Sequence, residues 1–424
     1  MELFLKNIGK IGTASIKIDG ITVIAGENNT GKSTISRALF SVFNAFHNVK
    51  DQIRKERVKG ISMVLVRKGF FNYLSEGNLF AENIVSKIKQ YKENPSAIEE
   101  EIKDELQKEK AVRGADYILE TAELDEIVSR IEEILNISDK ELQKAAVKEK
   151  LKSEFFGQIS NIYSDKESEI CLKIKNQYIN VSIVGNDVSE IKNENNISLY
   201  SEAVYIDDPF VLDEVGEMTG RLLLKSSNFS HRSHLAEKLL DNYKKQNLVD
   251  EVITQQKFKN IYEKLSSVCD GTVVEDKMQF GYQRTNSNKI LDIRNLSMGF
   301  KTFVILKMLL LNGSIGYNST IILDEPEIHL HPQWQLLFAE VIVLLQKEFG
   351  MQILINTHSP YFLNAIEVYT IKYGISDKCK YYLASVQKED SVIKDVTNHI
   401  ETIYQKLARP FQDLENEAGN ADET

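Results

Sequence analysis

The sequence predicts an α/β protein with a mixed sheet, flanking helices and one large helical insertion. Three observations lead to this prediction. Near the N-terminus, the apolar run 21–25 precedes a glycine-rich turn and then a helix-like segment, 34–46. Near the C-terminus, two more apolar runs, 320–324 and 352–357, end in polar residues, and a helical pattern lies between them. A long, charged stretch with a helical pattern separates these two parts, so the insertion divides the sheet-forming sequence.

The glycine-rich turn reads Gly26-Glu-Asn-Asn-Thr-Gly31-Lys32-Ser33, a full match to G-x-x-x-x-G-K-[ST]. A strand before it and a helix after it are the context that this phosphate-binding loop requires. Its glycines let backbone N–H groups turn toward phosphate oxygens, and the helix N-terminus adds the positive end of its dipole. Lys32 would contact the β- and γ-phosphates, and Ser33 would coordinate Mg²⁺. We therefore expect ATP to bind, with Mg²⁺, along Gly26, Asn28, Asn29, Thr30, Gly31, Lys32, Ser33 and Thr34.

Two acidic residues stand at the end of the first C-terminal apolar run. Asp324 is placed to coordinate Mg²⁺, and the adjacent carboxylate, Glu325, can polarise the attacking water. The second run is followed by His358, which can contact a γ-phosphate and orient the water. Glu327 is the competing acid, which we expect in a solvated turn or against the helix beyond Pro332. The predicted catalytic pair is Glu325 and His358.

A long apolar helix is expected to begin at Leu296-Ser297-Met298-Gly299-Phe300. Its serine hydroxyl, backbone N–H groups and dipole can contact a phosphate, so Ser297 and Gly299 join the expected ATP-binding residues. Four features follow one another along the chain: the phosphate-binding loop, this helix start, the strand that ends in two acids and the strand that ends before His358. Their order resembles that of the ABC-type ATPases. That resemblance implies an ABC-ATPase P-loop core.

Composition limits the class of protein. The chain has 424 residues, 42% of them hydrophobic, a net charge of −10 and a sequence pI near 5.4. This balance argues against a protein that generally coats nucleic acid. No run approaches 18 apolar residues, and the three cysteines lack metal or disulfide spacing, so a reduced, cytoplasmic location is expected. Two histidine pairs, 231/234 and 329/331, have no cysteine or third histidine nearby, which disfavours metal binding.

The chain is expected to divide into three parts. Residues 1–47 and 154–407 form a discontinuous ATPase core, 48–153 a helical insertion, and 408–424 an acidic, flexible tail. The insertion mixes both charges and lacks sustained heptads, so compact helices or a short helical hairpin are favoured over a long coiled coil. Within the core, strands are expected at 169–175, 178–184 and 203–207, helices over 210–268, and a hairpin from 278–282 and 289–293.

Three stretches of sequence resemble one particular group of ABC-type ATPases. Glu325-Pro-Glu-Ile-His-Leu-His331-Pro332 looks like the "DEPE-x-H-L-H-P" stretch of the OLD-like and RecF-like ATPases (AAA_15/AAA_21-like). The Thr357-His-Ser-Pro360 stretch and the P-loop also match this group, which resembles the chain over 1–46 and 290–375. The group has a lid glutamine that senses Mg²⁺ or water. Gln158, in Phe-Phe-Gly-Gln-Ile-Ser, is the candidate here.

The resemblance implies an ATP-dependent homodimer or higher assembly, in which Ser297 and Gly299 face the ATP of the other subunit. OLD proteins carry a nuclease domain after the ATPase. Only 66 residues follow His358, without a Glu and Asp-x-Asp cluster, so a nuclease would be a separate chain. Stand-alone relatives of this kind resemble ATPases of bacterial anti-phage systems of the Septu or PARIS type, which scaffold or restrain a separate effector such as a nuclease. Two alternatives are a RecF/SMC-like DNA-repair ATPase that acts on DNA and an ABC transporter subunit. The pattern implies no membrane partner.

Overall fold

The computed structural model describes residues 1–71, 74–113, 121–193, 197–216, 230–240, 259–276 and 279–422. The chain divides into two compact units: unit 1 is Met1–Phe46 with Val147–Thr424, and unit 2 is His47–Ala146. The expected insertion, 48–153, covers nearly all of unit 2 and continues along α7 (Asp139–Glu154), the helix in which the chain passes back into unit 1.

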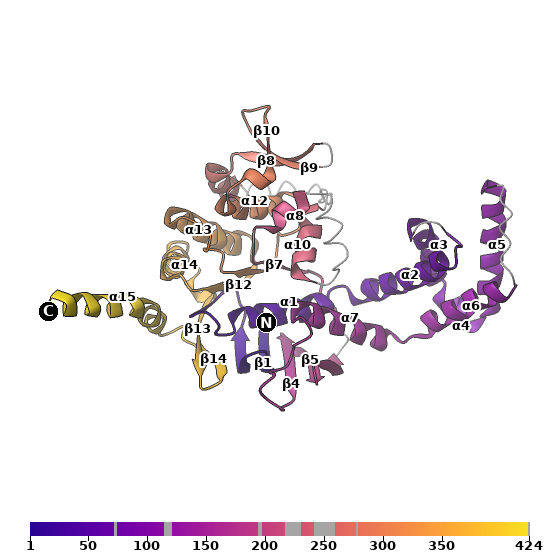
Figure 1. Ribbon diagram of the computed structural model, residues 1–424, viewed down its shortest axis with the longest axis horizontal. Coiled ribbons are helices and arrows are strands. Elements are labelled where there is room, and N and C mark those ends of the chain that lie inside the picture. The colour runs from indigo at the N-terminus through magenta and orange to yellow at the C-terminus, as the bar shows by residue number, and fades with distance from the viewer. Residues whose placement is uncertain are drawn as a thin grey trace. The chain divides into compact units, whose positions relative to one another are not determined.

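Unit 1 is built on a mixed sheet (Figure 1). The described strands pair in the order β6-β5-β4-β1-β2-β14-β13-β3-β12-β11-β7. Their bounds are β1 Glu2–Ile8, β2 Ile11–Lys17, β3 Ile21–Gly26, β4 Ser168–Ile174, β5 Gln177–Val184, β6 Asp187–Asn193, β7 Ala203–Ile206, β11 Thr320–Asp324, β12 Gln352–Thr357, β13 Cys379–Gln387 and β14 Asp390–Asp395. The α/β fold class with a mixed sheet and flanking helices is thereby confirmed.

The parallel part of this sheet positions the site. Strands β13, β3, β12, β11 and β7 run parallel, and β3, β11 and β7 are buried along their whole length. Their apolar, β-branched sequences suit a sheet that is covered on both faces. Because the strands are parallel, their carboxyl ends meet at one edge, where Asp324 lies opposite Asn356 and Thr357 lies opposite Ala25.

Helices flank the sheet of unit 1 (Figure 1). Besides α7, they are α1 Lys32–Ala45, α8 Val211–Gly216, α10 His231–Leu240, α12 Met298–Leu311, α13 Pro332–Phe349, α14 Pro360–Lys372 and α15 Glu401–Asp422. A second sheet contains β8 Gly271–Asp276, β9 Gln279–Arg284 and β10 Ile290–Asp292. The expected hairpin corresponds to β9 and β10, whereas β6 and β8 were not expected. Part of the expected helical region 210–268 falls at 217–229 and 241–258, outside the described residues.

Unit 2 consists of helices packed on an apolar core. They are α2 Val49–Arg67, α3 Leu74–Ser86, α4 Ile88–Glu93, α5 Ser96–Arg113, α6 Thr121–Asn136 and the start of α7. Ile61, Leu65, Ile84, Ile127 and Ile131 belong to its core and are fully buried or nearly so. Unit 2 is thus a set of separate helices, of 6 to 19 residues where they lie wholly within the unit, that share one apolar core.

The acidic tail expected at 408–424 lies mostly within a helix. The structure continues α15 to Asp422, with Pro410 inside the helix. The start of α15 packs within unit 1, where Ile403 is buried and the Tyr404 hydroxyl donates to Glu367 of α14 at 2.8 Å.

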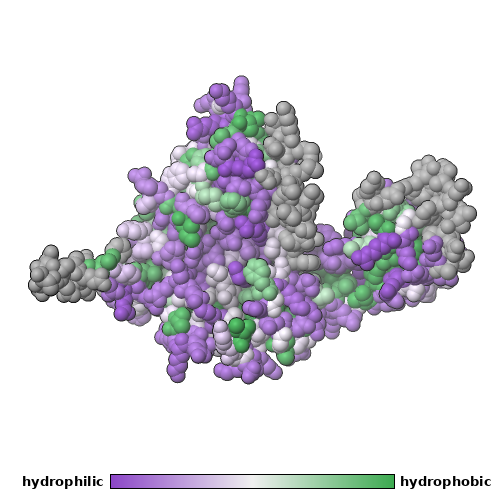
Figure 2. Space-filling view, in the orientation of Figure 1, coloured by the Kyte–Doolittle hydropathy of each residue, from purple (hydrophilic) through white to green (hydrophobic). Residues whose placement is uncertain are grey.

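The visible surface of unit 1 is largely hydrophilic, with scattered apolar side chains (Figure 2). Among the described residues, none of the helices combines the length and the apolar character needed to cross a membrane.

Candidate nucleotide-binding site

The P-loop ends in an open helix N-terminus. Gly31 is the N-cap of α1 and has φ +83°, a left-handed conformation that favours glycine. A Cβ at this position would lie 3.1 Å from Ile11 and 3.3 Å from Ser391. No side chain caps the helix, and its first turn carries no acidic residue. The N-terminal N–H groups and the positive end of the dipole are therefore available to an anion.

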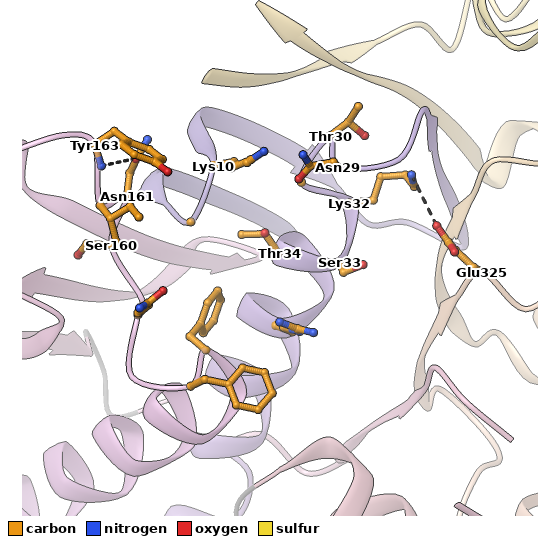
Figure 3. Close-up of a pocket in the computed structure, with 17 residues that line it drawn as sticks. Lys10, Asn29, Thr30, Lys32, Ser33, Thr34, Ser160, Asn161, Tyr163 and Glu325 are labelled. Atoms are coloured by element: carbon orange, nitrogen blue, oxygen red, sulfur yellow. Dashed lines mark hydrogen bonds and ion pairs between the residues drawn. The ribbon is translucent and has the colours of Figure 1, made fainter. Parts of the chain in front are cut away.

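Lys32 is buried beneath this loop. Its Nζ donates to the carbonyl oxygens of Gly26 at 3.0 Å and Glu27 at 2.8 Å, and it lies 3.8 Å from Oε1 of Glu325 (Figure 3). Burial lowers the pKa of Lys32, while the carboxylates of Glu325 and Asp324 oppose that shift. The ammonium group is thus held between the loop and the acidic strand end.

Asp324 is fixed by hydrogen bonds to both of its carboxylate oxygens. Nδ2 of Asn356 donates to Oδ1 at 2.8 Å, and the Tyr205 hydroxyl donates to Oδ2 at 2.7 Å. The same Asn356 amide donates to Oγ of Ser36 in α1, also at 2.8 Å. Burial and the neighbouring Asp324 raise the pKa of Tyr205 well above its usual range, so its hydroxyl remains a donor. Asp324 is therefore oriented by two neutral hydrogen-bond donors at the end of β11.

Glu325 occupies a strained position beside Lys32. Its φ is +50°, and its N–H donates to the carbonyl of Asn356 at 2.9 Å. The side chain is 26% exposed, and its Oε1 lies 3.5 Å from Nδ1 of His358. A left-handed conformation is costly for a residue with a side chain, and such strain concentrates at functional sites. The two predicted catalytic residues are thus neighbours.

Glu327 is not a solvated turn residue, and that part of the expectation for it is wrong. Its side chain is 3% exposed, and Oε1 accepts from the Thr357 hydroxyl and from the N–H groups of His358 at 3.1 Å and Ser359 at 3.2 Å. Burial raises the pKa of Glu327, although these hydrogen bonds lower it in part. The carboxyl group ties the loop after β11 to the end of β12, and so places His358.

A pocket of about 510 Å³ opens over the P-loop (Figure 3). Its lining includes eight residues that the sequence assigned: Asn29, Thr30, Gly31, Lys32, Ser33, Thr34, Gln158 and Glu325. Four other assigned residues are not part of the lining, although they are adjacent to lining residues in the sequence or contact them: Gly26, Asn28, Asp324 and His358. Sequence reasoning missed other lining residues, among them Lys10, Arg37, Phe156, Asn161 and Tyr163. Arg37 lies on α1 and the others lie outside the helices and strands, and none of them belongs to a recognised motif, so only their position in the fold identifies them.

Ser297 and Gly299 do not line this pocket. Ser297 is the N-cap of α12 and makes no side-chain capping hydrogen bond. Gly299 has a structural reason to be glycine, because a Cβ there would lie 2.5 Å from the carbonyl oxygen of His329. The start of α12 is therefore packed against the loop that follows Glu325.

A nucleotide with Mg²⁺ fits this set of residues. The helix N-terminus can take phosphate oxygens, and Ser33 and Asp324 offer the hydroxyl and carboxylate oxygens that Mg²⁺ prefers. Two polar atoms beside Glu325, Oε2 of Glu327 and Nδ1 of His358, are buried without a hydrogen-bond partner in the described part of the chain. No group of three metal-binding side chains occurs among the described residues, and Mg²⁺ in such sites takes its remaining ligands from phosphates and water.

Tyr205 and Asn356 are the contacts of Asp324 that sequence reasoning missed. The sequence carries a signal for each of these two residues. Asn356 is a polar residue inside an apolar strand, and Tyr205 is the polar-tipped residue of the strand run 203–207. Only the register of β7, β11 and β12 shows that both lie next to Asp324.

Comparison with known proteins gives one family match. The family described as "AAA_21: AAA domain, putative AbiEii toxin, Type IV TA system" matches residues 21–364. The chain is 30% identical over 174 residues to the "Retron Vc95 probable ATPase" of Vibrio cholerae serotype O1 biovar El Tor, which covers 36% of this chain and 32% of that protein. It is 28% identical over 157 residues to the "Septu protein PtuA" of Bacillus thuringiensis, and this match covers 32% of this chain and 38% of that protein. The match thus spans about a third of the length of these curated relatives.

Solved structures give more distant matches. The SMC head domain from Thermotoga maritima is 11% identical, with a TM-score of 0.40, over 93% of this chain and 98% of that chain. An SmcHead bound to the C-winged helix domain of ScpA is 14% identical, with a TM-score of 0.45, over 95% and 98%.

Proposed function

Because the chain belongs to the AAA_21 family, we propose that it binds ATP with Mg²⁺ in the pocket over the P-loop and hydrolyses it. The observation that carries this proposal is the convergence of Lys32, Asp324 and Glu325 at the carboxyl ends of β3 and β11. One observation about chemistry supports it further: a buried ammonium group and a doubly hydrogen-bonded carboxylate face an uncapped helix N-terminus.

Each residue has a role that its contacts suit. The N-terminal N–H groups of α1 and Lys32 bind phosphate oxygens. Ser33 and Asp324 would hold Mg²⁺, with Gln158 as a further candidate, and the ion when bound supplies charge neutralisation at the phosphates. Glu325 accepts the proton of the attacking water, and His358 contacts the γ-phosphate and orients that water. Glu327 keeps His358 in place through its backbone N–H.

The second half of the site comes from another copy of the chain in this proposal. Ser297 and Gly299 lie outside the pocket that the P-loop lines, and the N-terminus of α12 has no side-chain cap. A dimer closed around ATP would place this helix start against the γ-phosphate of the other subunit. ATP binding and hydrolysis would then close and open the dimer.

We place this cycle in anti-phage defence, where the chain would scaffold or regulate a separate effector such as a nuclease. The names of the two curated relatives support this role, since one is a retron ATPase and the other is a Septu protein.

Mixing two inactive variants tests the composite site. Lys32→Ala removes the phosphate contact, and Ser297→Arg places a bulky cation at the start of α12. Each variant alone should lack turnover. In a mixture, one of the two sites in each mixed dimer carries neither lesion, so activity should return to about a quarter of the wild-type rate if mixing is random.

Phosphate release by wild type, by each variant and by the equimolar mixture is the measurement. Wild-type protein without turnover would contradict hydrolysis. Active wild type with a mixture that stays inactive would contradict the arrangement in which the two subunits share each site.

A further inference from the structure

A buried histidine, His231, stacks on Tyr205, the residue that donates a hydrogen bond to Asp324. It has no role in the steps above. His231 is the first residue of α10, and its side chain is 13% exposed. Nδ1 lies 2.7 Å from Oε2 of Glu154, and Nε2 lies 2.9 Å from Oδ2 of Asp207. A neutral imidazole has one N–H and can donate to one carboxylate only. An imidazolium, which donates from both nitrogens, satisfies both carboxylates at once.

The contacts of His231 favour this charged form. Burial lowers the pKa of His231, but the hydrogen bonds to Asp207 and Glu154 outweigh it and raise the pKa to about 9. The backbone N–H of His231 also donates to Glu154, whose side chain is fully buried. Glu154 is the last residue of α7, and Asp207 directly follows β7. The imidazole is thus held in place by carboxylates at the end of α7 and just after β7.

The imidazole ring in turn fixes the ring of Tyr205. The two rings are stacked, with centroids 4.2 Å apart and planes 25° apart. Phe40 of α1 packs against both rings, 6.1 Å from that of His231 and 6.0 Å from that of Tyr205. A cation on the face of an aromatic ring is attracted by its π electrons, which adds to the packing. Tyr205 is fully enclosed and has little freedom to turn.

The far end of Tyr205 reaches the metal-binding carboxylate. Its hydroxyl donates to Oδ2 of Asp324 at 2.7 Å, and β7 lies beside β11 with Tyr205 paired to Ile322. The position of the phenol ring therefore decides where the hydrogen-bond donor stands and how the carboxylate is turned. Partners that orient a metal ligand commonly change metal affinity 10- to 100-fold when they are removed.

We propose that His231 is a positioning residue for Mg²⁺ binding: it holds the ring of Tyr205, which orients Asp324. This inference rests on the proposed nucleotide site. It adds a specific chain of contacts, Glu154 and Asp207 to His231, His231 to Tyr205, and Tyr205 to Asp324. A merely structural cluster would affect stability, whereas this arrangement predicts an effect on metal affinity that depends on the Tyr205 hydroxyl.

Binding of Mn²⁺, measured by electron paramagnetic resonance on the full chain with a non-hydrolysable ATP analogue, tests the proposal without relying on turnover. His231→Gln should weaken Mn²⁺ binding by about tenfold. Affinity for the analogue in excess chelator should stay unchanged, because the P-loop contacts remain. Tyr205→Phe should weaken Mn²⁺ binding at least as much. The double variant should be no weaker than Tyr205→Phe alone, because both changes interrupt one path.

His234→Gln is the matched control. His234 lies on the same helix and also packs on Phe40, with centroids 5.5 Å apart, but its Nε2 faces Glu202 at 3.6 Å. It should leave Mn²⁺ affinity unchanged. Asp207→Asn removes one carboxylate charge from a partly exposed residue, and it provides a milder test if His231→Gln does not fold. A smaller weakening is expected for it.

The outcomes separate the two proposals. If wild type binds neither the analogue nor Mn²⁺, the proposed nucleotide site fails and this inference fails with it. If wild type binds both, unchanged Mn²⁺ affinity in His231→Gln, or in Asp207→Asn where the former does not fold, overturns the positioning role alone. Additive losses in the double variant, or an equal loss in His234→Gln, would also overturn it.

Discussion

The two units of the chain use burial differently. Unit 1 encloses charged and polar side chains beside its sheet, including Lys32, Asp324 and Glu327, each of which has specific hydrogen bonds. In unit 2, only Arg57 and Ser62 are buried polar residues among those described, and the core is apolar. Burying a charge is costly unless partners are provided, and such residues are retained where chemistry needs them. The proposed nucleotide site lies in unit 1, among these buried charges.

The charged residues of unit 2 have a different character. Many are exposed and form ion pairs within the unit, such as Lys55 with Asp51 and Lys103 with Glu99, four residues apart on one helix. Pairs of this kind contribute little to stability because water and salt screen them. Changes at these ion pairs should therefore have little effect, whereas changes in the apolar core of unit 2 should act on folding and changes at the proposed site of unit 1 should act on nucleotide chemistry.

The largest expected effect is that of Glu325→Gln in unit 1. The amide has the shape of the carboxylate but cannot accept the proton of water, so turnover should fall by about 10²–10⁴-fold. Nucleotide should still bind through Lys32, Ser33 and Asp324, and ATP-filled dimers should accumulate. Steady-state phosphate release and analytical ultracentrifugation with ATP measure the two effects.

Glu327→Gln is the matched comparison. Its Oε1 can still accept from Thr357, His358 and Ser359, so turnover should fall much less than in Glu325→Gln. Loss of turnover in Glu327→Gln with normal hydrolysis in Glu325→Gln would mean that the base is misassigned.

A substitution in the apolar core of unit 2 tests whether that unit contributes to stability and not to nucleotide binding. Ile61 is fully buried in α2, and Ile61→Ala should destabilise the protein by about 2–5 kcal/mol through lost contacts and a cavity. Its affinity for ATP at 25 °C should match that of wild type. Denaturant unfolding and nucleotide titration are the two measurements, and a tenfold loss of affinity in a folded variant would break the division of roles.

The stability contribution of His231 should depend on pH. Its pKa is raised from 6.5 to about 9 in the folded chain, so the stabilisation is full below about pH 6.5 and is lost as the pH rises through about 9. The groups that face the imidazole are the carboxylates of Glu154 and Asp207 and the phenol of Tyr205. A shift of this size corresponds to roughly 3 kcal/mol.

The corresponding measurement is denaturant unfolding of wild type and His231→Gln from pH 6 to pH 10. The gap in the free energy of unfolding should shrink as the pH rises, since the imidazolium loses its proton. A gap that stays constant over this range would show that the charge of His231 contributes nothing to stability.

Much of the fold and the centre of the site could be predicted because their signals are local. The P-loop match between a strand and a helix placed Lys32, and the apolar strand with two terminal acids placed Asp324 and Glu325. The burial of Glu327 could not be predicted, because its partners lie on β12 and become neighbours only in the folded sheet. The same holds for Tyr205, which meets Asp324 through strand pairing across more than a hundred residues of sequence.

The central claim is that the P-loop of unit 1 binds ATP, and isothermal titration of the full chain with ATP and Mg²⁺ tests it most directly. Wild type should bind, and Lys32→Ala should lose detectable binding because a buried, charge-assisted contact to phosphate disappears. Lys10→Ala is the control, since this exposed lysine lines the same pocket outside the P-loop and should cause only a small loss. Binding by Lys32→Ala that equals wild type, or no binding by wild type, would contradict the account.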